Sequence, residues 1–434
     1  MSEQQIDVSQ FETLFPNMGK RNYGWVYKLD IPDEVYKTHT YIRSAPQMSR
    51  QIHVVQNESS IVRTNNTKVR KSQPAASPFD FRLTLDPQPM WEMISSVDTS
   101  SLEFSVFKSK IEEEDIKFVG TPSVIPSSII NIKPSKCKEM PTVERIYPEN
   151  IMEDPEILSI ISKPTTHKLR IIATARTLAA ISSCNRSVCP FDISFKKVGN
   201  DLYVLPCEPY STSVGETINE TSMVTEVVRR DDMAAEFLKN IPESTLAAEE
   251  FRQLIQSESS VENAQKSVLY RRIVFNDLEF IIRCDVDALH TPVTNNDRPD
   301  IAVCRTFCAV PTVIKPCNWN TRLEKEIEKS KVLTEEIKDN GALYAKWLAI
   351  TRLTNASSMV IGYARRKVSN TDSKHVLVGV SRQSFATGSK NVNFSDQYIF
   401  SVLNTVFSSF FSQENGVYTF IRDPKRRNYR IYKQ

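Results

Sequence analysis

The chain has 434 residues, enough for two or three domains, and its content of 40% hydrophobic and 25% charged residues is ordinary for a folded soluble protein. The 55 basic and 52 acidic side chains give a formal net charge of +3, so total charge alone does not indicate a nucleic-acid binder. The eight cysteines form no C-x-x-C pair and have no histidine at zinc-finger spacing, so neither a metal site, a disulfide framework nor a cofactor is expected. No apolar run approaches the ~20 residues of a membrane helix, and the first residues do not resemble a secretory leader, so we expect a cytoplasmic protein with no membrane contact.

The N-terminal third divides into two expected parts. Residues 1–85 are rich in Asn, Gln, Ser and Thr and lack periodicity, which is typical of an extended, partly disordered arm. The basic residues between 63 and 71 can contact phosphate or an acidic partner, or can belong to a solvated linker. Residues 86–141 hold short alternating apolar pieces between Pro-containing connectors, which predicts a small β-rich or docking segment.

Residues 142–434 are predicted to form one α/β domain. Helices are expected over residues 167–184, 224–266 with an interruption at Pro242, 318–329, 341–353 and 395–411. Strand pairs are expected around Gly199-Asn200, Asn276-Asp277 and Asp423-Pro424, with further strands over 331–338, 359–366 and 374–382. Because strands alternate with helices, the fold class expected is mixed α/β, with a mixed β-sheet core flanked by helices.

Two strands of this prediction carry candidate site residues at a spacing of two. Asp285 and Asp287 share one face of a strand, and Glu336 and Lys338 share one face of the predicted strand 331–338. Paired carboxylates with a lysine are what a metal-dependent phosphodiesterase needs to hold Mg²⁺ or Mn²⁺ and stabilise developing charge. Such pairs also occur as ordinary polar contacts in a charged chain, so both interpretations stay open.

Cations and aromatic residues near strand ends favour RNA contact. Arg283 and Arg365 lie near predicted strand ends, and Trp319, Tyr363 and Phe385 offer stacking surfaces. The C-terminal hairpin carries the strongest basic patch of the chain, formed by Arg422, Lys425, Arg426, Arg427 and Arg430. This patch suits ribosomal RNA or an acidic partner, and a solvated edge hairpin is the alternative. No phosphate-binding glycine loop is present, which disfavours nucleotide hydrolysis.

The order of several short motifs resembles the family formed by the D subunit of eukaryotic translation initiation factor 3. The motifs are SSCNRSVCPFDISFKKVG, YRRIVFNDLEFIIRCDVDA, NWNTRLE followed by EEIKDN and AKWLA, IGYARR, DSKHVLVG, NVNFS and IRDPKRRNYRIY, and they span residues 142–432. The resemblance implies a fold similar to that of the decapping exoribonucleases, with a positively charged tunnel that binds the mRNA 5′ cap without cleaving it. Asp285, Asp287, Glu336 and Lys338 then represent the remnant of a nuclease metal site.

The resemblance also implies particular residues around the tunnel. An insertion that closes the tunnel, the RNA gate, matches about residues 208–222, and its residues here are Glu208, Gly215, Glu216, Thr217, Asn219 and Glu220. Further cap-groove candidates are Arg186, Cys189, Glu226, Arg229 and Arg230. This chain departs from the family at Ala175, where the family has an acid, and at Cys189, where the family has an aromatic residue, so a partner for the guanine edge and a stacking surface are missing.

The expected function is therefore that of a non-enzymatic subunit of the initiation factor 3 complex. Its N-terminal arm is expected to dock other subunits, and its α/β domain is expected to bind the mRNA 5′ end and support recruitment of mRNA to the small ribosomal subunit. Two alternatives stay open: a metal-dependent decapping or exoribonuclease enzyme, and a scaffold subunit without cap binding.

Overall fold

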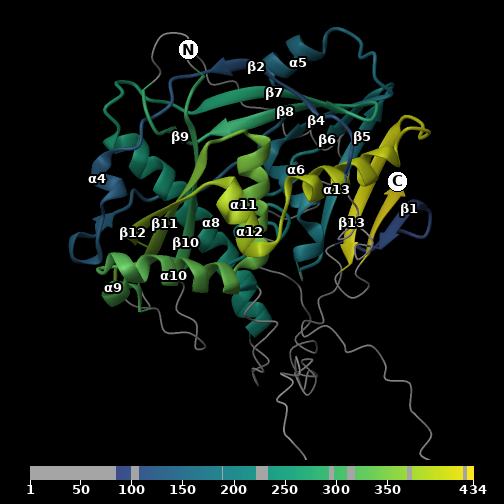
Figure 1. Cartoon of the computed structure of the whole chain (residues 1–434). Coiled ribbons are helices and arrows are strands. Elements are labelled where there is room, and N and C mark those ends of the chain that lie inside the picture. The colour runs from purple at the N-terminus through teal and green to yellow at the C-terminus, as the bar shows by residue number, and fades with distance from the viewer. Residues whose placement is uncertain are drawn as a thin grey trace, which may run out of the picture.

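The computed structural model describes residues 85–98, 107–187, 189–220, 233–292, 298–309, 318–368, 374–423 and 428–434. These residues form two β-sheets with helices between and around them (Figure 1). The predicted arm, residues 1–85, lies outside the described residues except for its last position. Among the described residues, no helix combines the length and the apolar character needed to cross a bilayer.

The larger sheet has nine strands in the order β1-β14-β13-β5-β6-β4-β8-β7-β2. In chain order, its strands are β1 (Glu92–Asp98), β2 (Glu112–Val119), β4 (Leu169–Thr174), β5 (Phe191–Val198), β6 (Asp201–Val204), β7 (Ser267–Phe275), β8 (Leu278–Val286), β13 (Gly416–Asp423) and β14 (Asn428–Lys433). The central strand β4 runs parallel to both neighbours, β6 and β8, and the remaining pairs are antiparallel. The carboxyl ends of β4 and β8 therefore lie at the same edge of the sheet.

The smaller sheet has five strands in the order β3-β12-β11-β10-β9. Its strands are β3 (Lys138–Glu139), β9 (Ala288–Leu289), β10 (Ile301–Ala309), β11 (Ser358–Arg366) and β12 (His375–Gln383). Strands β10 and β11 are parallel, whereas β11 and β12 are antiparallel. Both sheets are mixed, so the predicted fold class, a mixed β-sheet core flanked by helices, is confirmed.

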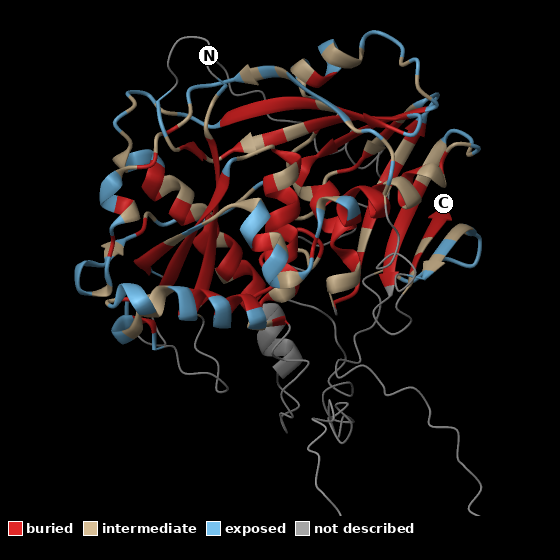
Figure 2. Cartoon of the chain, in the orientation of Figure 1, coloured by how far each residue is buried: buried red, intermediate tan, exposed pale blue. Residues whose placement is uncertain are grey.

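Helices α6, α11 and α13 form the layer between the two sheets (Figure 1). The helices are α4 (Ser127–Ile130), α5 (Pro155–Ile161), α6 (Ala175–Ser182), α8 (Met233–Glu258), α9 (Trp319–Arg322), α10 (Glu326–Asp339), α11 (Gly341–Leu353), α12 (Phe385–Val392) and α13 (Asp396–Ser408). Helix α8 packs on β10, and α11 contacts α6 on one side and β10 and β11 on the other. Figure 2 shows that the strands and these central helices are mostly buried, whereas α4, α9, α10 and α12 present exposed faces.

Aromatic side chains fill the space between α13 and the larger sheet. Phe407 of α13 meets Phe195 and Phe280 edge-on, with ring centroids 6.0 and 5.4 Å apart. Phe400 meets Phe275 in the same way at 5.4 Å. Edge-to-face pairs of buried rings contribute roughly 0.5–1.5 kcal/mol each beyond their burial, so this cluster fixes α13 on the sheet.

The described residues of the segment 86–141 include β1, β2 and β3, and these strands join both sheets. β1 pairs with β14 and β2 pairs with β7 in the larger sheet, and β3 pairs with β12 in the smaller sheet. Backbone hydrogen bonding is therefore continuous across the expected boundary at residue 142.

Most predicted elements of the α/β part are present, with four differences. The predicted helix 318–329 is interrupted at residues 323–325, so α9 and α10 are separate helices. The predicted helix 167–184 is instead strand β4 followed by α6, because all six residues of β4 are buried and a fully buried strand has no alternation to distinguish it from a helix. The predicted strand 331–338 belongs to α10, whose buried residues Val332, Leu333, Glu336 and Ile337 follow a helical spacing. The described helix α8 continues through Pro242 rather than breaking there.

Candidate functional site

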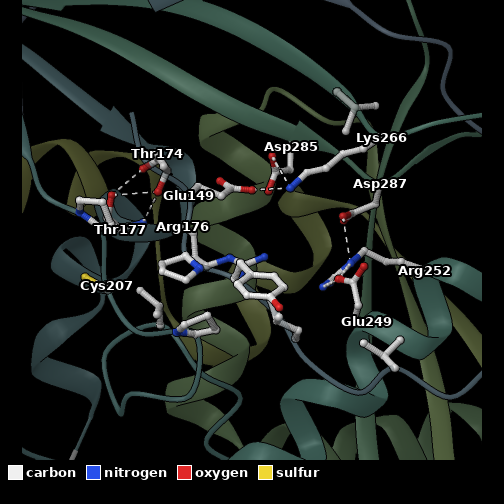
Figure 3. Close-up of a pocket in the computed structure, with 18 of the residues that line it drawn as sticks. Glu149, Thr174, Arg176, Thr177, Cys207, Glu249, Arg252, Lys266, Asp285 and Asp287 are labelled. Atoms are coloured by element: carbon white, nitrogen blue, oxygen red, sulfur yellow. Dashed lines mark hydrogen bonds and ion pairs between the residues drawn. The ribbon is translucent and has the colours of Figure 1, made fainter. Parts of the chain in front are cut away.

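A pocket of about 340 Å³ lies at the edge of the larger sheet where β4 and β8 end (Figure 3). Thr174 ends β4, and Arg176 and Thr177 follow in the first turn of α6. Asp285 and Asp287 come from the end of β8 and the residue after it. Helix α8 and the loops at 143–149 and 204–214 complete the wall. Pockets at the carboxyl ends of parallel strands are a common place for ligands, because chain segments diverge there.

On the β8 side of the pocket, two carboxylates share two cations. Arg283 Nη1 lies 2.5 Å from Glu149 Oε2 and 2.8 Å from Asp285 Oδ1, and its Nε donates to Asp154 Oδ2 at 3.0 Å. Lys266 Nζ lies 2.6 Å from Glu149 and 3.8 Å from Asp285. Burial and the neighbouring charge of Glu149 raise the pKa of Asp285 to about 6. Burial works against the charge of Glu149, but its hydrogen bond with Asp285 and the cations Lys266 and Arg283 lower its pKa.

The second aspartate, Asp287, is held just as tightly. Its Oδ2 accepts from the backbone N–H of Cys304 at 2.8 Å and from Arg305 Nη1 at 2.9 Å. Its Oδ1 lies 3.7 Å from Arg252 Nε, and Arg252 is also paired with Glu249 one turn earlier on α8. Each of the four acidic side chains that line the pocket thus has at least one arginine or lysine partner.

Arg176 is the cation that the pocket leaves available. Within the part of the chain that the structure describes, its guanidinium forms no ion pair, and Figure 3 shows it projecting into the middle of the pocket. It follows Thr174, the N-cap of α6, whose side chain accepts from the backbone N–H of Thr177 at 3.1 Å. The positive end of a helix beside an unpaired guanidinium favours an anion, such as a phosphate.

The arrangement suits binding of an anion better than binding of a divalent metal. A catalytic Mg²⁺ or Mn²⁺ needs carboxylate oxygens that are free to coordinate it. In this pocket, each carboxylate already has a contact with Lys266, Arg283, Arg305 or Arg252 through at least one of its oxygens, so a metal ion would have to compete with these cations. Tyr147, at the rim, is 70% exposed and lies beside Arg145, whose guanidinium is 5.0 Å from the ring centroid, so a flat surface for stacking is present.

The structure brings together only part of the predicted groove. Asp285 and Asp287 line the pocket, and Arg283 lies directly behind it. Glu336 and Lys338 do not line it, and the prediction that they share one face is wrong. They lie on α10, where positions two apart point in different directions: Glu336 is buried and accepts from Trp319 Nε1 at 3.1 Å, whereas Lys338 is exposed.

Three further groove candidates lie elsewhere. Arg186 donates to the carbonyl of Asn393 at 2.9 Å, Arg365 donates to Asn320 Oδ1 at 2.9 Å, and neither residue lines the pocket. Cys189 is fully buried beside Glu220, and burial together with that neighbouring charge raises the pKa of its thiol well above the usual range. The remaining groove candidates, Glu226, Arg229 and Arg230, lie outside the described residues.

The residues assigned to the RNA gate divide into two groups. Pro209 and Val214 of this segment line the pocket, and Glu208 lies next to them in the same loop. Gly215, Glu216, Thr217 and Glu220 are buried. Glu216 accepts from Trp347 Nε1 at 2.7 Å, Glu220 accepts from Thr217 Oγ1 at 2.9 Å, and the backbone N–H of Asn219 donates to Asn340 Oδ1 at 2.6 Å. In this structure, residues 215–220 pack against α8 and α11. Their assignment to an RNA gate stays a prediction.

The C-terminal hairpin differs from the expected basic patch. Arg422 is buried, and its Nε donates to the carbonyl of Cys184 at 2.9 Å, so it holds the turn after α6 and contributes nothing to a surface. Arg430 is half-buried, with its guanidinium 5.7 Å from the ring centroid of Tyr432. Lys425, Arg426 and Arg427 lie outside the described residues.

The predicted stacking residues are mostly core residues, and the sequence reasoning missed several pocket residues. Tyr363 is fully buried and Trp319 is nearly so. The missed pocket residues are Tyr147, Glu149, Arg176, Glu249, Arg252 and Lys266. One signal was available in the sequence: Arg176 follows a buried apolar run and a threonine N-cap, the pattern of a strand that leads into a helix beside a ligand site.

The fold and the site together define a mixed α/β protein with a pocket at the carboxyl end of its parallel strands, lined by four basic and four acidic side chains. The family model described as "Eukaryotic translation initiation factor 3 subunit 7 (eIF-3)" matches residues 34–433. The chain therefore belongs to this family, and the family resemblance predicted from its motifs is confirmed.

Curated relatives are named as the D subunit of eukaryotic translation initiation factor 3. The protein from Arabidopsis thaliana is 23% identical over 389 residues, which cover 85% of this chain and 63% of that protein. The human protein is 22% identical over 366 residues, which cover 79% of this chain and 64% of that protein. The chain thus spans about three fifths of the length of these relatives.

Solved structures with a similar chain trace are Rai1 and Dxo1 proteins. Rai1 from S. pombe, in complex with 3′-FADP, aligns with a TM-score of 0.46 and 8% identity, covering 80% of this chain and 100% of the other. Rai1 from Scheffersomyces stipitis, in complex with (3′-NADP)⁺ and calcium, has a TM-score of 0.47 and 10% identity, covering 81% and 94%. Dxo1 from K. lactis, in complex with manganese, has a TM-score of 0.41 and 9% identity, covering 80% and 96%.

Proposed function

We propose that this chain is a non-enzymatic component of translation initiation factor 3 that binds the 5′ end of an mRNA in the pocket beside Arg176. Family membership supports the first half of the proposal. The pocket supports the second half, because it offers an unpaired guanidinium at the N-terminus of α6 and an exposed tyrosine at the rim. A phosphate at Arg176 and a base on Tyr147 are the contacts expected for a nucleotide end.

The single observation that carries the binding function is the pairing of every lining carboxylate. Glu149, Glu249, Asp285 and Asp287 each face an arginine or lysine partner. A nuclease would need those carboxylates for its metal ions. Here they instead neutralise and position cations, and Arg176 remains for the ligand.

The second candidate function is a metal-dependent decapping or exoribonuclease activity. The convergence of four carboxylates in one pocket favours it. Metal binding would first have to displace Lys266 from Glu149, at 2.6 Å, and Arg252 from Asp287, at 3.7 Å. The side chains of both acids are largely buried. Incubation of capped and 5′-phosphorylated RNA with Mn²⁺ distinguishes the two functions, since Mn²⁺-dependent product that is lost in Asp287→Ala would establish the enzyme.

The proposal is tested by titrating a fluorescent cap analogue into the full chain. Replacement of Arg176 by alanine is expected to weaken binding by about 10- to 100-fold, since a hydrogen bond to a charged group contributes about 1.5–3 kcal/mol. Lys338→Ala is the matched control, because it removes an exposed cation that does not line the pocket, and this variant is expected to bind like the unmodified protein. Equal affinity for Arg176→Ala and Lys338→Ala contradicts the proposed site.

Family membership supports a wider role in the complex, and this role extends the proposal. The N-terminal arm docks other factor subunits, the pocket faces mRNA near the small ribosomal subunit, and the protein works in the cytoplasm. Co-purification of the tagged chain with other subunits of the factor tests the first part. Crosslinking to the 5′ end of mRNA distinguishes this role from that of a scaffold subunit. A scaffold subunit would co-purify with the other subunits but would form no crosslink to the RNA.

A further inference from the structure

A second cluster of chemically active side chains lies outside the pocket, between α8 and the smaller sheet. Cys308 is near the end of β10, His375 begins β12, and Glu243 and Glu250 lie two turns apart on α8. The sulfur of Cys308, a ring nitrogen of His375 and a carboxylate oxygen of Glu243 all lie within 4.8 Å of one another. Because the three residues are 65 and 67 positions apart, no spacing motif in the sequence reveals the group.

His375 is oriented as a metal-binding histidine usually is. Its Nδ1 lies 2.7 Å from Glu250 Oε2, and both side chains are 3% exposed. Its Nε2 points the other way, 3.2 Å from Glu243 Oε1. A carboxylate on one ring nitrogen fixes the tautomer and directs the other nitrogen at the metal, which is the usual support for zinc-bound histidine.

The geometry points to a Zn²⁺ site, and we propose that Cys308 Sγ, His375 Nε2 and Glu243 coordinate one zinc ion, with Glu250 as the positioning residue. A thiolate, an imidazole and a carboxylate together favour zinc over Mg²⁺ or Ca²⁺, which prefer all-oxygen sites. With Zn–S of about 2.3 Å and Zn–N of about 2.0 Å, ligand atoms of a tetrahedral site lie about 3.5 Å apart, so the three side chains close by roughly 1 Å. Glu243 is half-buried, so this side of the cluster is accessible to solvent, and water is the expected fourth ligand.

Glu243 also pairs with Arg366 through both of its oxygens, so zinc has to compete with this guanidinium for the carboxylate, while Cys308 and His375 supply the two stronger zinc ligands. Arg366 Nε donates to Glu243 Oε1 at 2.6 Å, and β11 places Arg366 directly opposite His375 in the sheet. Arginine on a ligating carboxylate holds the carboxylate in place and balances its charge. Cysteine binds zinc as a thiolate and histidine as a neutral imidazole, so zinc binding displaces any protons that these two groups carry.

In this arrangement, the ion joins three elements that are distant in the chain. Helix α8 would be fixed to β10 and β12 through metal–ligand bonds, and the same helix carries Glu249 and Arg252 in the wall of the pocket. Zinc here stabilises the fold, so its removal is expected to lower the melting temperature by about 5 °C.

The test is the metal content of the full chain, purified without chelator. About one zinc per chain is expected. Cys308→Ser and His375→Asn are expected to lose it, whereas Cys184→Ser and His290→Asn, a buried thiol and a hydrogen-bonded histidine outside the cluster, keep it. Glu250→Gln leaves the ligands in place and is expected to weaken zinc affinity by about 10- to 100-fold.

A second measurement does not depend on how well the ligand variants fold. Co²⁺ added to the zinc-free protein is expected to produce thiolate-to-cobalt charge-transfer absorption that saturates at one equivalent and is competed away by Zn²⁺. Absence of both zinc and this absorption overturns the proposal and leaves an ion-pair cluster with a doubly protonated His375. Zinc that persists in both Cys308→Ser and His375→Asn also overturns it, because the metal then binds elsewhere.

Discussion

Replacement of Arg283 by methionine tests the charge network behind the pocket. The guanidinium of Arg283 contacts Glu149, Asp154 and Asp285 at 2.5, 3.0 and 2.8 Å, and its side chain is 13% exposed. Methionine keeps much of the side-chain volume and removes the charge. Three carboxylates then face one another with Lys266 as the nearest cation, and loss of one member of a buried ion pair costs about 3–5 kcal/mol.

The destabilisation is expected to depend on pH in a defined direction. Without Arg283, repulsion among the carboxylates raises the pKa values of these groups in the folded protein above the value of about 4 that they have in the unfolded chain. At pH values above about 4, the folded state therefore binds more protons than the unfolded state. The stability deficit relative to the unmodified protein therefore shrinks as the pH falls from 7 toward 5.

Urea denaturation at pH 7 and pH 5 measures both effects. Arg298→Met is the matched control, because Arg298 is 46% exposed and pairs with Asp115, and an exposed pair contributes less than about 1 kcal/mol. A loss for Arg283→Met no larger than for Arg298→Met, or a loss that is the same at both pH values, would refute the reasoning.

Two further predictions concern the stability of the fold. Burial opposes the charge of Glu113, but hydrogen bonds from Arg352 and Arg271 lower its pKa to about 2, so its contribution to stability is present above pH 4.5 and is lost as the pH falls toward 2. Glu113→Gln should therefore cost about 1–2 kcal/mol at pH 7 and flatten the acid side of the stability profile in urea denaturation, and an unchanged acid slope would contradict this. Gly215→Ala should lower the free energy of unfolding by about 1–3 kcal/mol, because a Cβ there would lie 2.7 Å from the Ser211 carbonyl, whereas Gly416→Ala, with 3.6 Å of space, should be neutral by the same measurement.

The sequence predicted those elements whose boundaries carry local signals. The β5–β6 hairpin turns at Gly199 with a φ of +60°, and the β7–β8 hairpin turns at Asn276 and Asp277 with φ of 48° and 63°. These are residue types that tolerate left-handed backbone. Strand β4 carries no such signal, because it is buried on both faces, and only its pairing with β6 and β8 distinguishes it from a helix.

Only part of the candidate site could be predicted, because only part of it carries a local signal in the sequence. Asp285 lies in β8 and Asp287 directly follows this strand, whose alternation is visible in the sequence, so a shared direction of the two side chains could be inferred. Glu336 and Lys338 were predicted on a strand but lie on α10. Side chains two residues apart share a face on a strand, whereas on a helix they point in different directions. The partners of the aspartates, Lys266 and Arg252, come from other elements, and only tertiary structure brings them into the pocket.

The central claim is that the pocket holds an RNA end through its cations and uses no catalytic metal. The most direct measurement incubates the full chain with a capped oligonucleotide, with and without added Mn²⁺, and follows both the fraction bound and the length of the RNA. Saturable binding that is the same in both conditions, with the RNA intact, is the predicted result. Binding that requires Mn²⁺, or RNA that is decapped or shortened when Mn²⁺ is present, would contradict the claim.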